Sequence, residues 1–178
     1  MKIQSLDGVW RFRQAYDSDW ANGQVPGGVH TDLLALGRIS DPFVADNELK
    51  VQWVAERDWE YQRCFITDPD LLGEDRIFLV CDGLDMLAEI FLNGHYLGHT
   101  DNMFRRWEWS IKPFLKKGEN TLRIVFGSPL HYIQERQAQL PLTGGGDIPG
   151  GPHLRKSPCH WGWDWGPKLP PIGIWKSI

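Results

Sequence analysis

The stretch Met86-Leu-Ala-Glu-Ile-Phe-Leu-Asn-Gly-His-Tyr-Leu-Gly98 decides the fold class of this chain. Its centre is Asn93-Gly94, a dipeptide that a type I′ turn favours because both central positions of that turn need positive φ. The runs on either side, Met86 to Leu92 and His95 to Gly98, have the length of strands. They predict a β-hairpin, and therefore antiparallel sheet, in the middle of the chain.

Other segments with strand character surround this hairpin. Polar and apolar residues alternate with period two in three segments, Val9–Arg13, Trp59–Phe65 and Trp107–Ile111. Two continuous apolar runs predict buried strands, Arg76–Cys81, which is expected to be buried on both faces, and Leu122–Phe126. Short strands at this spacing are typical of a β-sandwich or jelly roll. We therefore expect one all-β, jelly-roll domain over residues 1–178, a length that suits a single core.

Two short helices and one loop interrupt the strands. Thr31 to Gly37 predicts one or two helical turns, with Thr31 as N-cap and Gly37 just after the helix end. Ser128 followed by Pro129 predicts the capped start of a helix over 129–140. The glycine- and proline-rich stretch Pro141 to Pro152 predicts a loop.

Composition excludes several function classes. The formal net charge of −4 offers no electrostatic footprint for nucleic acid, and no apolar run approaches the ~20 residues of a membrane helix. No signal peptide is visible at the amino terminus. Three cysteines are too few and too uneven in number for a disulfide framework, which favours a reducing cytoplasm as the location.

The run His160-Trp-Gly-Trp-Asp-Trp-Gly-Pro167 is the strongest candidate site. If the run is extended, the three tryptophans share one side and Asp164 lies between glycines on the other. A carboxylate framed by empty space and backed by indoles suits a sugar, which has hydroxyls and an apolar face. The alternative is that the tryptophans are core and Asp164 only closes a turn. The residues alone leave both interpretations open.

Other chemistry finds little support in the sequence. The glycine stretch lacks the Lys-Ser/Thr of a phosphate-binding loop, and there is no Gly-x-Ser-x-Gly elbow. His95 and His99 flank a turn, so we expect no metal site, and no cofactor is implied. The acidic cluster around Glu60 alternates with arginines and is interpreted as a solvated edge with ion pairs. A complete pair of catalytic carboxylates is not visible, so no catalytic residue is assigned.

Several stretches resemble the N-terminal sugar-binding domain of glycoside hydrolase family 2. The general set is Leu6–Phe12, the Asn93-Gly94 turn and Gly118–Leu122. Three more stretches resemble the β-mannosidase branch of that family, namely Val25–Leu33, Trp53–Tyr61 and His160–Trp175. The resemblance covers essentially the whole chain.

The resemblance implies the removal of terminal, non-reducing β-D-mannose with retention of configuration. It also implies that immunoglobulin-like domains and a (β/α)₈ barrel, which carries both catalytic glutamates, are missing here, so that the chain alone is inactive. By the same resemblance Asp164 would accept hydrogen bonds from sugar hydroxyls, and Trp163 or Trp165 would form an apolar wall. Arg155 would be a partner of Asp164 or of the sugar, while Trp161 and Trp175 would serve core or interdomain packing.

Three alternatives accompany this interpretation. The chain could be a carbohydrate-binding module that acts by itself, or a structural domain whose tryptophans pack against other domains. It could also be the same domain of a related β-galactosidase or β-glucuronidase. Burial of Asp164 with all its hydrogen bonds made to backbone would favour the structural domain.

Overall fold

A computed structural model describes residues 2–178 of the chain. Strands make up most of its regular structure, and they are β1 (Gly8–Gln14), β2 (Ala21–Val25), β3 (Trp59–Ile66), β4 (Phe78–Cys81), β5 (Leu84–Asp85), β6 (Ala88–Leu92), β7 (His95–Thr100), β8 (Trp107–Ser110), β9 (Glu119–Phe126), β10 (Trp161–Trp163), β11 (Gly166–Lys168) and β12 (Gly173–Ile174). The helices are α1 (Val29–Ala35), α2 (Pro69–Leu72) and α3 (Pro129–Gln139). Short 3₁₀ turns are η1 (Asn47–Lys50), η2 (Gln52–Val54), η3 (Lys112–Phe114), η4 (Gly151–His153) and η5 (Pro158–His160).

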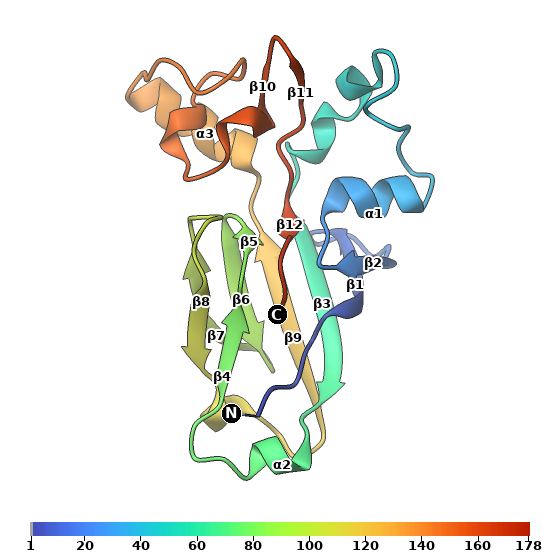
Figure 1. Ribbon diagram of the computed structural model, residues 1–178, viewed down its shortest axis with the longest axis vertical. Coiled ribbons are helices and arrows are strands. Elements are labelled where there is room, and N and C mark those ends of the chain that lie inside the picture. Colours follow the sequence, from blue (N-terminus) through green and yellow to red (C-terminus); the bar gives the residue numbers. More distant parts are fainter. Residues whose placement is uncertain (1) are drawn as a thin grey trace.

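The strands build two layers around one main core, which confirms the all-β sandwich. The larger layer is an antiparallel sheet of six strands in the order β2-β1-β3-β9-β6-β7. The pairs β4–β8 and β5–β12 face it as a shorter second layer. The β10–β11 hairpin stands apart from both layers at one end of the molecule, between α3 and the segment of η1 and η2 (Figure 1).

The predicted central hairpin is confirmed as β6 and β7, which pair antiparallel with Leu92 opposite His95. Asn93 and Gly94 have φ of 53° and 83°, the positive values that a type I′ turn needs. The Asn93 side chain also accepts a hydrogen bond from the Thr121 backbone N at 2.9 Å. The turn is therefore fixed to β9 as well as closed by its own backbone.

Two of the predicted strand environments are wrong. The apolar run at 76–81 forms β4, but Phe78 is half exposed because β4 lies in the two-stranded outer layer, where only one face meets the core. Glu60 was expected on a solvated edge. Instead β3 lies between β1 and β9, so Glu60 is buried and pairs with Arg13 and, at 3.0 Å, with Arg123.

The two predicted helices form, with one shifted start. Ser128 caps α3, since its hydroxyl accepts a hydrogen bond from the His131 backbone N at 3.1 Å. In α1 the N-cap is Gly28, three residues before the predicted one. Thr31 lies inside the first turn, where its hydroxyl accepts from the Gly28 backbone N at 3.1 Å. Gly37 follows the helix with φ of 66°, as expected.

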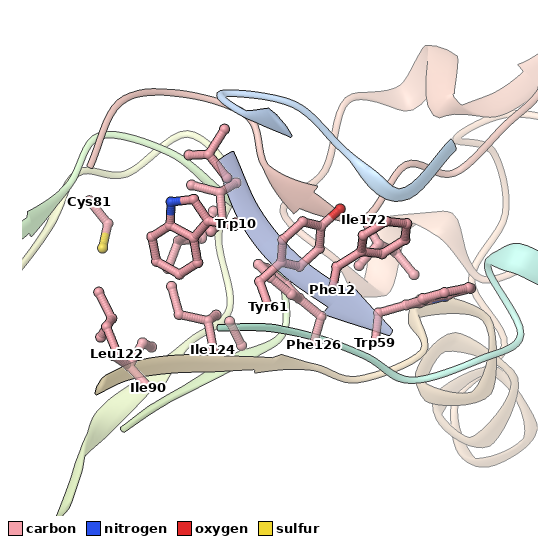
Figure 2. Packing of buried hydrophobic residues seen from close by; sticks show 14 of the residues in the cluster. Trp10, Phe12, Trp59, Tyr61, Cys81, Ile90, Leu122, Ile124, Phe126 and Ile172 are labelled. Carbon is pink, nitrogen blue, oxygen red and sulfur yellow. The ribbon is translucent and has the colours of Figure 1, made fainter. Parts of the chain in front are cut away.

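The main core lies between the two layers and is rich in aromatic side chains. Phe12 and Tyr61 stack with ring centroids 5.5 Å apart, and Tyr61 meets Phe126 edge to face (Figure 2). A second, smaller cluster gathers Trp161 with residues of α3 and nearby loops; its other members are Ala55, Met86, Met103, Leu130, Ile133 and Leu154. This second cluster connects the β10–β11 hairpin to the rest of the domain.

Candidate functional site

The candidate site lies on the β10–β11 hairpin. Trp161 pairs with Lys168 and Trp163 with Gly166, so the chain reverses at Asp164 and Trp165. The interpretation of the run as one extended strand is therefore wrong, because the chain folds back after Trp163. The turn is possible because Gly162 adopts a φ of 84°, which glycine reaches without strain, and Gly166 leaves open space beside the tip.

The tryptophans of the hairpin divide into one that anchors and two that are exposed. Trp161 is only 1% exposed and belongs to the second core cluster, as expected from the sequence. Trp163 and Trp165 are 43% and 71% exposed, respectively. Their ring centroids are 6.2 Å apart with the planes tilted by 32°, which leaves two open apolar faces near the tip.

Asp164 lies between Trp163 and Trp165 in the sequence, at the tip of the hairpin, and is exposed. Within residues 2–178 it has no hydrogen-bond or ion-pair partner, so its carboxylate oxygens are free to accept hydrogen bonds from a ligand. A purely structural role would be favoured by an Asp164 that is buried and bonded to backbone, and the exposed Asp164 does not fit that description.

Arg155 is held by the loop at 102–103. Its backbone O accepts a hydrogen bond from the Met103 backbone N at 3.1 Å, and the residue bridges to Asn102. Among the ion pairs and hydrogen bonds of the described residues, none joins Arg155 to Asp164. Arg155 instead borders a hollow of about 410 Å³ that Phe104, Pro158 and Trp161 also line. Its contact with a sugar stays a prediction.

The hairpin is held along both strands. The loop before it, predicted from its glycines and prolines, donates to β10 through the backbone N of Asp147 and Ile148, at 3.1 Å and 3.0 Å. On the other side, the Gln52 amide donates to the Lys168 backbone O at 2.7 Å. The base of the hairpin is therefore fixed between two segments, while its tip projects.

A buried charged group lies beneath the hairpin, and the sequence analysis missed it. The Lys156 ammonium donates to Asp85 at 2.5 Å and to the Pro171 backbone O at 2.7 Å. His160 Nδ1 lies 4.0 Å from the second Asp85 oxygen. A lone aspartate in the apolar run Leu84 to Leu87 was the one sequence signal for a buried partner; nothing local marks Lys156.

Burial dominates the acid–base properties of this group. It raises the pKa of Asp85 and lowers the pKa of Lys156, and the attraction between the two opposes both shifts. Burial, with the Lys156 charge as a smaller cause, lowers the pKa of His160 and of His30 to about 4. Both histidines are therefore neutral at pH 7. Their Nδ1 atoms are buried and, within residues 2–178, have no hydrogen-bond partner.

The described residues offer neither a metal site nor a membrane-spanning helix. No group of three or more His, Cys, Asp or Glu side chains in residues 2–178 is arranged to hold a metal ion. None of the helices in that range has the length and apolar character needed to cross a bilayer.

The two-layer antiparallel sandwich places the chain in the class of galactose-binding-like domains. The sequence profile of one family in this class, described as "Glycosyl hydrolase 2 galactose-binding domain-like", matches residues 10–176. The chain belongs to this family, which confirms the resemblance drawn from the sequence.

Its relatives include several β-mannosidases. The chain is 38% identical to Beta-mannosidase B of Emericella nidulans over 177 residues, which cover 95% of this chain and 21% of that protein. It is 33% identical to Beta-mannosidase of Capra hircus, over 98% of this chain and 21% of the relative. The chain thus spans about a fifth of the length of these relatives.

The solved structures similar to this chain also include a β-mannosidase. The crystal structure of Beta-D-Mannosidase from Dictyoglomus thermophilum is 44% identical with a TM-score of 0.95, covering 99% of this chain and 22% of that one. A beta-D-glucuronidase of the same organism is 22% identical with a TM-score of 0.52, over 70% of this chain and 19% of its own. The second likeness concerns the fold alone.

Proposed function

We propose that this chain is one domain of a longer retaining β-mannosidase that removes terminal, non-reducing β-D-mannose residues. The names of the relatives and their fivefold greater length support this proposal. Retaining glycosidases act through two carboxyl groups about 5–5.5 Å apart. We assign both to other parts of the longer protein, a (β/α)₈ barrel accompanied by immunoglobulin-like domains. The chain itself contributes substrate contacts.

The observation that carries the proposal is the free, exposed carboxylate of Asp164 at the hairpin tip, where its two sequence neighbours are exposed tryptophans. In the proposed pocket, Asp164 accepts hydrogen bonds from hydroxyls of the mannose, and Trp163 or Trp165 covers an apolar face of the sugar. Arg155 is proposed as a weaker contact with the sugar. Asp164 is then a specificity residue and not a nucleophile, since a site that hydrogen-bonds a hydroxyl rejects analogues without it.

Substitution of Asp164 in the longer protein tests this role. We expect Asp164→Asn to lower kcat/KM on an aryl β-mannoside by about 100-fold or more, because charged hydrogen bonds to hydroxyls are lost. Circular dichroism should show an unchanged fold. Asp75→Asn, at an exposed carboxylate, is the matched control and should leave kcat/KM unchanged. Near wild-type efficiency of Asp164→Asn would mean that the carboxylate serves the structure only.

The isolated chain gives an independent test. We expect purified residues 1–178 to produce no measurable hydrolysis of the same aryl β-mannoside, because both catalytic carboxyl groups are assigned elsewhere. Turnover that co-purifies with the chain and saturates with substrate would contradict that assignment.

A carbohydrate-binding module that acts alone is the second candidate, favoured by the exposure of the two indoles. Titration of the isolated chain with mannose and mannobiose, followed by tryptophan fluorescence, separates the two candidates. Saturable binding that Trp165→Ala removes would support the module. An unchanged spectrum would support a pocket that needs the other domains.

We further propose that the protein acts in the cytoplasm. The three cysteines are free thiols, which suits a reducing compartment. Fractionation of cells that express the natural protein, with an antibody against this domain, would test the location.

A further inference from the structure

Residues 157–170, which carry Asp164, leave the sandwich and return to it at nearly the same place. One side chain joins the two ends of this excursion. Lys156, directly before it, donates from its ammonium to the backbone O of Pro171, directly after it, at 2.7 Å. The excursion is therefore closed at its base by a single buried cation.

The cation is anchored in the sandwich by Asp85. The two side chains are 2.5 Å apart and are 0% and 3% exposed for Lys156 and Asp85, respectively. Asp85 belongs to β5 and pairs with Gly173 of β12, so its position is set by the second layer of the fold. The second carboxylate oxygen faces His160, the residue before β10. One carboxylate thus contacts the charge at the base and approaches the start of the hairpin.

A stabilising role alone explains this pair poorly. Removing two charges from water costs nearly as much as their attraction returns, so well-packed apolar side chains would stabilise the fold as well or better. An ion pair, however, specifies one geometry where apolar packing accepts several. A buried ammonium that bridges a carboxylate and a backbone carbonyl is suited to fixing position.

The geometry points to Lys156 and Asp85 as positioning residues that set where Asp164 stands relative to the sandwich. This inference rests on the proposed function of Asp164. The base of the hairpin can transmit position to the tip, since Trp161 is packed in the second core cluster and Gln52 holds Lys168. Productive contacts tolerate little displacement, and small errors of placement cost catalytic efficiency.

The first test measures the hairpin in the chain itself. The variant Lys156→Met with Asp85→Leu replaces the pair by apolar side chains, which avoids an unpaired buried charge and keeps the fold. We expect amide hydrogen exchange in residues 161–168 to become at least about tenfold faster, while amides of β9 keep their protection. Lys2→Met with Glu74→Leu, which removes an exposed pair far from the hairpin, should change neither.

Unchanged exchange in residues 161–168 would overturn the inference. A uniform acceleration that includes β9 would also overturn it, because the pair would then stabilise the whole domain and not place the hairpin.

The second test asks whether the pair acts through Asp164, in the longer protein with an aryl β-mannoside. We expect the double variant to lower kcat/KM by about tenfold or more, and Asp164→Asn to cost much less in that background than in the natural one. Additive effects would overturn the link between the pair and Asp164. If Asp164→Asn has no effect in the natural background, the proposed function fails, whatever the exchange experiment shows for the hairpin.

Discussion

At the scale of single residues, Asp32 is a carboxylate that serves the structure, although it lies in Val25–Leu33, one of the stretches that resemble β-mannosidases. It is buried, accepts a hydrogen bond from the Tyr61 hydroxyl at 2.6 Å and another from the Gln24 backbone N at 2.9 Å. A Cβ on Gly23 would lie 2.5 Å from its Oδ2, so only glycine fits beside it. Burial raises the pKa of Asp32, and the two hydrogen bonds oppose that shift. The carboxylate joins α1 to β2 and β3.

Removing the Tyr61 hydroxyl should therefore destabilise the domain. Tyr61→Phe leaves a buried carboxylate oxygen without its donor, and we expect the free energy of unfolding to fall by about 1–3 kcal/mol. Urea unfolding followed by circular dichroism measures the change. Tyr16→Phe, at an 83% exposed tyrosine, is the matched control and should stay within about 0.5 kcal/mol of wild type. Equal stability of Tyr61→Phe would mean that water replaces the hydroxyl.

At the scale of elements, the β6–β7 turn shows local preference and tertiary contact acting together. The Asn93 amide donates to the Phe114 backbone O and to Asn120, both at 2.8 Å, and its oxygen accepts from Thr121. Asn120 is itself fully buried and accepts from the Lys116 backbone N at 2.8 Å. The dipeptide that predicts the turn thus also connects it to β9 and to the loop before β9.

Two substitutions separate these contributions. We expect Asn93→Gly to cost about 1–2 kcal/mol of unfolding free energy, because it keeps the positive φ and loses only the side-chain bonds. Asn93→Ala should cost roughly 1 kcal/mol more, since it also strains the left-handed backbone. Urea unfolding of wild type and both variants measures the two losses of unfolding free energy and shows which is larger. An alanine variant as stable as the glycine variant would contradict the role of the backbone.

At the scale of the whole molecule, three segments contribute four side chains to the buried group beneath the hairpin. His30 comes from α1, Asp85 from β5, and Lys156 and His160 from the chain before β10. The Lys156 charge disfavours a second cation, so burial and Lys156 together lower the pKa of His30 and His160 to about 4. The convergence of these segments makes stability sensitive to acid.

The direction of that pH dependence follows from the lowered pKa values. Between pH 6.5 and about 4 the unfolded chain binds protons at these histidines and the folded chain does not, so stability falls as the pH falls through this range. We expect wild type to lose more unfolding free energy from pH 7 to pH 5 than His30→Gln, by about 1–2 kcal/mol. The exposed His131→Gln should behave like wild type. Parallel pH profiles of wild type and His30→Gln would contradict a neutral, buried His30.

Much of the fold could be predicted because its signals are local. The Asn93-Gly94 turn, the Ser128 cap and the alternation in β1 and β3 depend on residues a few positions apart, and backbone preferences act over that distance. The exposed Asp164 could also be singled out by its tryptophan and glycine neighbours. The reversal of the chain at Asp164 could not, since a period-two pattern fits one strand or a tight hairpin equally well.

Residue patterns along the chain therefore suffice to predict the class of fold, its family and the segment that carries the candidate site. Which side chains are buried, and with which partners, depends instead on how distant segments pack together. Lys156 and Asp85 are 71 positions apart, and Glu60 is buried only because two strands distant in sequence flank β3. A charge becomes a buried positioning group through the segments that enclose it, and no residue pattern near it in the chain encodes those segments.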